Sequence, residues 1–255
     1  MHRELDTPAF VLRTRPFGES DRIVTLLTAR HGKLSGIAKG AKNSRRRFAG
    51  TLEPFVHIRA VFRQRASSDL VFLLRCELLA ALRGFSRDLD RFAAGSYVLE
   101  LTDRLVFGRE SGADVYQLLH EALTLLDHGT AVSPVLRAFE LHMLAATGYA
   151  PALDRCRACG TRAADVFFLD DERGGLACRR CVSVGRLVKP VAAATMQALA
   201  RVAAAPMAAA AAAADSMPVE AAAVAEQLIA AVVQGPLRTR EFMLRARVDS
   251  PGLVR

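Results

Sequence analysis

Short runs of residues rich in Val, Ile, Leu, Phe and Thr follow one another through residues 8–77. Turn-forming residues interrupt these runs, and runs of this length bounded by Gly, Pro, Ser and Asp are typical of β-strands. The predicted strands cover residues 10–13, 22–28, 33–39, 55–62 and 70–77, and the predicted breaks cover residues 16–18, 31–32, 40–50 and 66–69.

Five strands in about 70 residues, with one long basic loop over residues 40–50, favour a small Greek-key barrel of the OB type. An SH3-like barrel has a similar number of strands, and periodicity alone does not separate the two. We expect an N-terminal five-stranded OB-fold β-barrel over residues 1–80, with the SH3-like barrel as the alternative.

The apolar pattern becomes helical after Phe85. Over residues 88–107 apolar side chains recur every three or four residues, as on one face of a helix. The fold class is therefore α+β and multidomain, with an α-helical domain over residues 81–255. Further helices are predicted over residues 114–128 and 237–247, from Ser133, from near Pro190, and from Asp215 to Gly235.

Local signals refine two of these helices. The helix after residue 132 is expected to have Ser133 as its N-cap, Pro134 at its first position and Gly148 just beyond its last turn. The alanine tract over residues 203–214 has high helical propensity but offers little to pack. We expect a frayed helix or a mobile connection there.

Composition is that of a globular protein, with 51% hydrophobic and 24% charged residues. The N-terminus carries charges of both signs and has no apolar run typical of a secretory signal. The longest apolar stretches are alanine-rich and are interrupted by Pro206, Asp215 and Pro218, so no membrane span is expected. The cytoplasm is the expected compartment.

The positive charge is concentrated at one end of the chain. The net charge is +9, and residues 1–80 hold 15 Lys and Arg against seven Asp and Glu. Residues 22–52 contain eight cations and no acid. Such a field suits a polyphosphate partner, because each neutralised phosphate releases condensed counterions. The alternative is a solvated basic face without a ligand.

Two Cys-x-x-Cys pairs, Cys156 with Cys159 and Cys178 with Cys181, are separated by 18 residues. Each pair can form a tight turn that directs two thiolates to one point, and a hairpin over residues 166–178 can bring the pairs together. This spacing predicts a zinc site rather than two disulfides, which are rare in the reducing cytoplasm. Cys76, alone in a predicted strand, is expected to be a core residue.

The predicted zinc is structural. Four cysteines close the tetrahedron, whereas a catalytic zinc keeps one position for water. Arg157, Arg179 and Arg180 flank the thiolates and are expected chiefly to balance their charge, with phosphate contact as the alternative. Three consecutive acids over residues 170–172 are expected to be solvated turn residues.

No enzymatic motif is complete. The segment from Gly32 to Ser35 resembles part of a phosphate-binding loop, but its lysine precedes Leu34 and position 27 is leucine. Nucleotide-binding glycine motifs, nucleophile elbows and zinc-protease signatures are absent from the sequence, and the six histidines are scattered. We therefore predict a protein that is not an enzyme.

Several stretches carry a resemblance to a known family. The first is the opening stretch over residues 9–24, with its Glu19-Ser20-Asp21 turn. The others are residues 28–36, 38–42, 52–55, 147–151 and 156–160, together with Phe168, Gly174, Gly175, Cys178 and Cys181. With the order of barrel, helices, cysteine hairpin and further helices, these stretches resemble the RecO family of bacterial recombination mediators. The resemblance is thin beyond Ala192.

The resemblance implies a non-enzymatic mediator that binds single- and double-stranded DNA and anneals complementary strands. It also implies partners: RecR, the acidic C-terminal tail of single-stranded DNA-binding protein and, indirectly, RecA. The zinc-binding part falls at about residues 151–186 of the helical domain. The predicted DNA-binding residues are Lys33, Lys39, Lys42, Arg45, Arg46, Arg47 and Phe48.

Phe48 has two interpretations, base stacking beside the arginines or anchoring in the core. Two other classes of function fit the same residues. A zinc-ribbon RNA-binding or transcription factor would use the charges on RNA, and an adaptor would use them on acidic protein tails.

Overall fold

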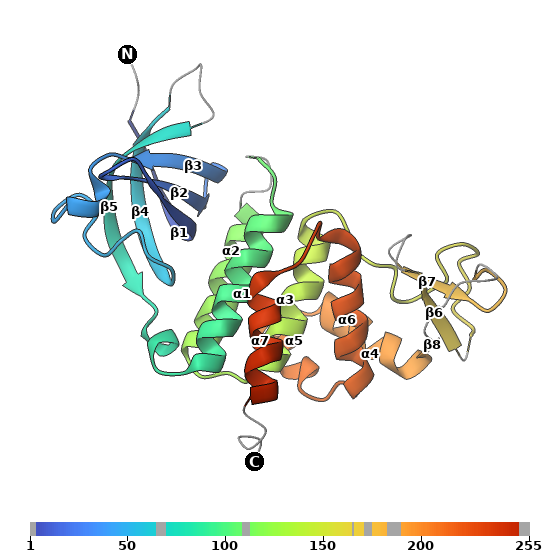
Figure 1. Ribbon diagram of the computed structural model, residues 1–255. Helices are drawn as coiled ribbons and strands as arrows, with labels where there is room; N and C mark the ends of the chain where they lie inside the picture. The colour runs from blue at the N-terminus through green and yellow to red at the C-terminus, as the bar shows by residue number, and fades with distance from the viewer. Residues whose placement is uncertain are drawn as a thin grey trace. The chain divides into compact units, whose positions relative to one another are not determined.

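The computed structural model describes residues 4–64, 70–108, 113–164, 166–170, 175–182 and 190–249. Five strands form the N-terminal part (Figure 1). They are β1 (Glu4–Phe17), β2 (Asp21–Thr28), β3 (Gly32–Ala38), β4 (Val56–Arg63) and β5 (Leu70–Ala81). These bounds match the predicted strands closely, except that β1 is much longer than the predicted four residues.

The strands close into a barrel in the order β1-β2-β3-β5-β4. Strand β1 is long because it pairs with β4 through its first half and with β2 through its second half. A register shift between Val11 and Arg13 marks the bend between the two halves. β3 and β5 pair in parallel, and the other pairs are antiparallel. The order is that of an OB fold, so this prediction is confirmed.

Alternate residues of each strand fill the barrel, as the two-residue period of a strand requires. The buried cluster includes Val24, Leu26, Ile58 and Phe62 from the strands. Gly36 of β3 allows β5 to approach closely, because a Cβ atom there would lie 2.9 Å from Cγ of Leu73. Phe48 and Leu52, which follow β3, also belong to this core.

Contacts divide the chain into two units. The first comprises Met1–Gly129 with Leu237–Arg255, and the second comprises Thr130–Pro236. The first unit therefore extends past the expected boundary at residue 80, and it holds the barrel, a 3₁₀ turn η2 (Arg83–Ser86), α1 (Leu89–Leu105), α2 (Ala113–Asp127) and the last helix α7 (Arg238–Asp249).

Carboxylates fix the starts of two helices in the first unit. The side chain of Asp88 accepts hydrogen bonds from the N–H groups of Asp90 and Arg91, which begins α1. The start of α7 is satisfied from another helix, because Glu100 of α1 accepts the N–H groups of Arg238 and Thr239. The last helix is thereby fixed to α1.

The second unit is a helical bundle that carries a small sheet. Its helices are α3 (Val132–Ala146), α4 (Ala193–Ala204), α5 (Met207–Ala214) and α6 (Val219–Val232). Its strands are β6 (Val166–Asp170), β7 (Gly175–Cys178) and β8 (Pro190–Ala192), in the order β7-β6-β8. No helix within the described ranges is long and apolar enough to cross a membrane.

Two local expectations for this unit are corrected. α3 begins at Val132 with Ala131 as N-cap, so Ser133 caps nothing and Pro134 is the third helical residue, where a missing N–H group still costs no helical bond. The alanine tract is helical in α5, and every third or fourth residue is buried against α3 and α4. Small side chains allow that close packing.

The predicted end of α3 is confirmed. Gly148 has a φ of 85°, the left-handed conformation that glycine adopts readily. The N–H of Tyr149 bonds to the carbonyl of Leu144 and that of Gly148 to the carbonyl of Ala145. This is the Schellman arrangement that closes a helix at its C-terminus.

Candidate metal centre and nucleic-acid interface

Each cysteine pair lies in a tight turn that its backbone hydrogen bonds define. In the first, the N–H of Gly160 bonds to the carbonyl of Cys156, and the N–H of Cys156 bonds to the carbonyl of Thr161. In the second, the N–H of Cys181 bonds to the carbonyl of Cys178, the last residue of β7. The predicted hairpin of β6 and β7 places Cys178 opposite Phe167.

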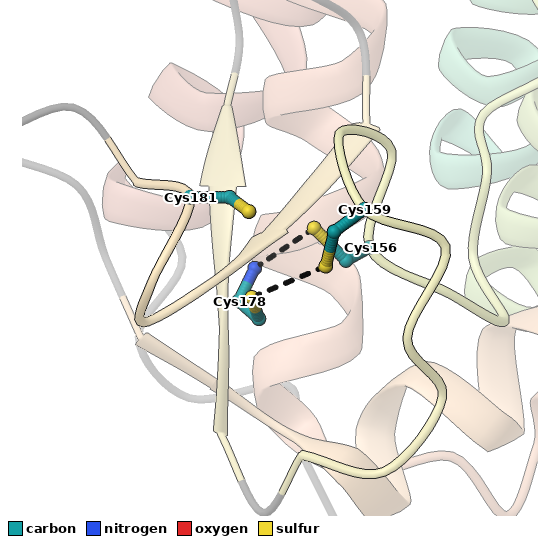
Figure 2. A group of neighbouring side chains, drawn as sticks. All are labelled: Cys156, Cys159, Cys178 and Cys181. Atoms are coloured by element: carbon teal, nitrogen blue, oxygen red, sulfur yellow. Dashed lines mark hydrogen bonds between the residues drawn. The ribbon is translucent and has the colours of Figure 1, made fainter.

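The two turns bring four thiols to one point (Figure 2). One sulfur atom from each of Cys156, Cys159, Cys178 and Cys181 lies within 4.8 Å of the other three. The Sγ atoms of Cys159 and Cys178 are 3.7 Å apart. Zinc bound about 2.3 Å from four thiolates at tetrahedral angles places its ligands about 3.8 Å apart. All four cysteines are free of disulfides, so the geometry fits a single metal ion.

The thiols differ in their affinity for protons. Burial raises the pKa of Cys156, but hydrogen bonds from the backbone at Cys159 and Cys178 outweigh it and lower the pKa to about 6. Hydrogen bonds to the sulfur atoms of Cys159 and Cys178 raise the pKa of Cys181 to about 12. Without a cation the cluster therefore retains protons, and a divalent ion would displace them.

Three arginines lie next to the cysteines in the sequence. Arg157, Arg179 and Arg180 are exposed, and among the described residues their guanidinium groups have no ion-pair partner. Arg179 and Arg180 line a hollow beside Cys178. Their positions fit the predicted balance of charge around thiolates. Of the predicted acidic turn, residues 171–172 lie outside the described residues.

The basic segment, residues 39–47, follows β3 and is anchored at both ends. At its start, the N–H of Gly40 bonds to the carboxylate of Asp21, 2.8 Å away. A 3₁₀ turn η1 (Ala41–Asn43) follows. At its end, the ring of Phe48 is only 3% exposed. The arginines between these points are therefore held on a short turn at the barrel surface.

Two of the predicted DNA-binding residues have contacts inside the first unit. Phe48 is buried in the barrel core, so its ring has no free face for a base, and the core-anchoring interpretation holds. Lys33 of β3 is directed to α1, where its ammonium forms an ion pair of 3.1 Å with Asp103. With a side chain 20% exposed, Lys33 links barrel and helix. These contacts lie 70 residues apart in sequence, which no local pattern reveals.

The five other predicted residues are exposed. Arg47 donates a hydrogen bond to the carbonyl of Lys39, and its guanidinium lies 5.2 Å from the ring centroid of Phe48. Arg45 and Arg46 have no side-chain hydrogen bond or ion pair within the described part of the chain. Lys39, Lys42, Arg45, Arg46 and Arg47 thus form one exposed basic group.

Sequence reasoning overlooked the hairpin that adjoins this group. Arg15 and Phe17, near the end of β1, are both exposed. The predicted break over residues 16–18 contains Phe17, and Arg15 belongs to no predicted strand or break. An aromatic residue before a glycine, in a hairpin bordered by arginines, was the signal available in the sequence.

Comparison with known sequences covers most of the chain. The family described as "Recombination protein O N terminal" matches residues 1–82, and the family described as "Recombination protein O C terminal" matches residues 86–241. The chain belongs to the RecO family. The second RecO match includes all four cysteines.

Named members of the RecO family are similar in sequence to this chain over most of their length. The DNA repair protein RecO of Anaeromyxobacter sp. (strain K) is 43% identical over 197 residues, 75% of this chain and 76% of the relative. That of Geobacter sulfurreducens is 38% identical over 196 residues, 76% of this chain and 78% of the relative. That of Syntrophus aciditrophicus is 34% identical over 197 residues, 76% of each chain. The family resemblance is confirmed.

Proposed function

We propose that this RecO protein is a mediator of DNA repair and homologous recombination whose barrel binds the DNA backbone. It binds single- and double-stranded DNA and helps complementary strands anneal. RecR, the acidic tail of single-stranded DNA-binding protein and, indirectly, RecA are its partners, as the family resemblance implies. It acts in the cytoplasm, at the nucleoid during repair.

The exposed group of five cations carries this proposal. Arg45 and Arg46 have no acidic partner among the described residues, so their charge is available to phosphate. Arg22, by contrast, is already paired with Glu53 at 2.7 Å. Strands repel through their phosphates, and cations that neutralise some of them lower that repulsion while leaving the bases free to pair.

The cysteine cluster has a structural role in this proposal. One zinc ion held by four thiolates would join the two cysteine turns and leave no coordination position for an activated water. Nothing in this arrangement requires a catalytic step, and we propose that the protein is not an enzyme.

Salt dependence of DNA binding tests the proposal. Contact with about four phosphates of a single strand gives a slope near −3 for log affinity against log salt, from about −0.7 per contact. The double variant R45A/R46A should flatten this slope by about 1.4 and bind all sequences more weakly. Fluorescence anisotropy with a labelled single strand measures both. Arg47 is left intact because it also contacts Lys39 and Phe48.

A matched control removes the same charge elsewhere on the barrel. Arg59 and Arg63 of β4 are paired with Asp6 and Glu4, so R59A/R63A should retain the parental slope. If both double variants behave alike, the basic segment is only a solvated face. Preference for RNA of matched length would favour an RNA-binding factor, and the absence of salt-dependent binding to single-stranded DNA would favour a protein adaptor.

Annealing gives a second readout. Complementary strands coated with single-stranded DNA-binding protein should anneal faster with the parent protein than with R45A/R46A. Equal annealing rates for the two proteins would contradict the role of the segment in bringing strands together.

A further inference from the structure

Phe17, the last residue of β1, leaves a large apolar side chain in water. It is 50% exposed, whereas Phe10, Phe48 and Phe62 of the same barrel unit are at most 3% exposed. Burying an aromatic ring is favourable. A ring left in solvent at a surface site is therefore available to a partner with a flat apolar face.

Hydrogen bonds join the Phe17 hairpin to the basic segment. The ammonium of Lys42 bonds to the carbonyls of Gly18 and Glu19, at 3.0 and 2.7 Å. The backbone N–H of Lys42 bonds to the carbonyl of Ser20 at 3.0 Å. Phe17 itself pairs with Asp21, whose carboxylate accepts the N–H of Gly40. The ring and the cations therefore share one end of the barrel.

An exposed cation lies near the ring on its own strand as well. Arg15 lies two residues before Phe17 and so on the same face of β1, and its side chain is exposed. Lys39, at the start of the basic segment, is also exposed, and its ammonium lies over a different ring, 5.8 Å from the centroid of Phe72. An aromatic ring bordered by cations is the arrangement that proteins use to bind single-stranded nucleic acid, with phosphates on the cations and a base on the ring.

We infer that Phe17 stacks on an unpaired base of the strand whose phosphates the basic segment holds. This inference rests on the proposed function and deepens it. It assigns the stacking role, expected of Phe48, to a ring with a free face. Every base has such a face, so the contact adds affinity without selecting sequence. Bases inside a duplex are already stacked, so Phe17 adds nothing to the binding of double-stranded DNA.

The test compares three DNA ligands of equal length: a single strand, the same strand with abasic sites, and a duplex. Anisotropy titrations use the parent, F17A, and F17Y, which retains a ring. F17A should bind the single strand at least about fivefold more weakly, the effect of losing one stacked base. It should bind the abasic strand and the duplex as the parent does. F17Y should behave like the parent.

Two further variants show whether an effect on binding comes from the ring of Phe17 itself. F242A removes an equally exposed phenylalanine, 46% exposed, from α7 and should leave all three affinities unchanged. F17W places a single tryptophan in a chain that has none. Its fluorescence should be quenched by the single strand and unchanged by the abasic strand. This signal reports the contact even if F17A is poorly folded.

The outcomes separate this inference from the proposed function. Equal affinity of F17A and parent for the single strand, with the parental salt slope intact, overturns the role of Phe17 alone. An equal loss for all three ligands overturns it too, because the ring would then act through folding. Loss of binding to the acidic tail of single-stranded DNA-binding protein, with unchanged DNA affinity, would assign the ring to a protein contact and likewise overturn it. A parent without affinity for DNA overturns both proposals.

Discussion

His57 of β4 is a half-buried histidine within a cluster of aromatic rings. Its ring stacks on Phe10 with centroids 4.6 Å apart, and its Nε2 atom shares a hydrogen bond of 2.5 Å with the hydroxyl of Tyr116. The ring of His120 lies 5.1 Å away. Burial, and then repulsion from His120, lower the pKa of His57 from 6.5 to about 4. The neutral ring is the form that joins β4 to α2.

This lowered pKa predicts loss of stability in acid. The unfolded chain takes up a proton on His57 below pH 6.5, and the folded chain does so only near pH 4. Stability from this group is therefore complete above about pH 6.5 and is lost as pH falls toward 4. H57F retains the stacked ring and cannot take up the proton. Between pH 7 and 4.5, Tm should fall less for H57F than for the parent, and an identical fall would contradict the prediction.

Within the second unit, α3 contains a buried ion pair whose arginine also bonds to α6. Arg137 and Glu140 of α3 form a contact of 2.6 Å, with side chains only 10% and 1% exposed. Arg137 also donates to the carbonyl of Ala222 in α6, 3.1 Å away. Both charges have left water, and Arg137 also lies 3.6 Å from the carboxylate of Glu226 in α6, so the cation compensates charge on both helices.

Removal of one partner should therefore be costly. R137A leaves the Glu140 carboxylate buried without its cation, and we expect a loss of about 3–5 kcal/mol in the free energy of unfolding. Replacing both residues, as in R137M/E140L, should restore most of that loss, because an apolar pair needs no charge compensation. Urea unfolding measures both variants.

An exposed pair provides the control for this measurement. Arg59 and Asp6 are 42% and 52% exposed and 3.4 Å apart, and R59A should cost less than about 1 kcal/mol. If R137A costs no more than R59A, the pair in α3 does not stabilise the bundle.

At the scale of the whole molecule, the sequence predicted what depends on local pattern. Strand periodicity located the barrel, and the spacing of the cysteines predicted the cluster at Cys156 and Cys178. The sequence pattern could not show that Lys33 pairs with Asp103, or that the start of α7 bonds to Glu100, because those partners are far apart in the chain. The packing that makes α5 an ordered helix likewise comes from neighbouring helices. Burial of Phe48 and exposure of Phe17 depend on how the barrel closes.

The metal centre belongs to this scale because its ligands come from two separate turns. We expect one zinc ion per chain in protein purified without chelator. Structural zinc contributes about 10–16 kcal/mol of apparent binding free energy at neutral pH, so C178S should disorder or misfold the second unit. Metal analysis measures the zinc and limited proteolysis the folding, with C76S as the control because Cys76 lies in the barrel core. Protein with no zinc would contradict the prediction.

The cysteine cluster and the basic segment should also act independently. The cysteines belong to the unit Thr130–Pro236, whereas Arg45 and Arg46 belong to the unit that begins at Met1. A chelator that removes the metal should therefore destabilise the second unit and leave the salt slope for single-stranded DNA unchanged. R45A/R46A should show the reverse, with a flatter slope and a full complement of zinc. Anisotropy and metal analysis on the same samples measure both. If the chelated protein loses its salt-dependent affinity, the metal-bound unit contributes to the DNA site.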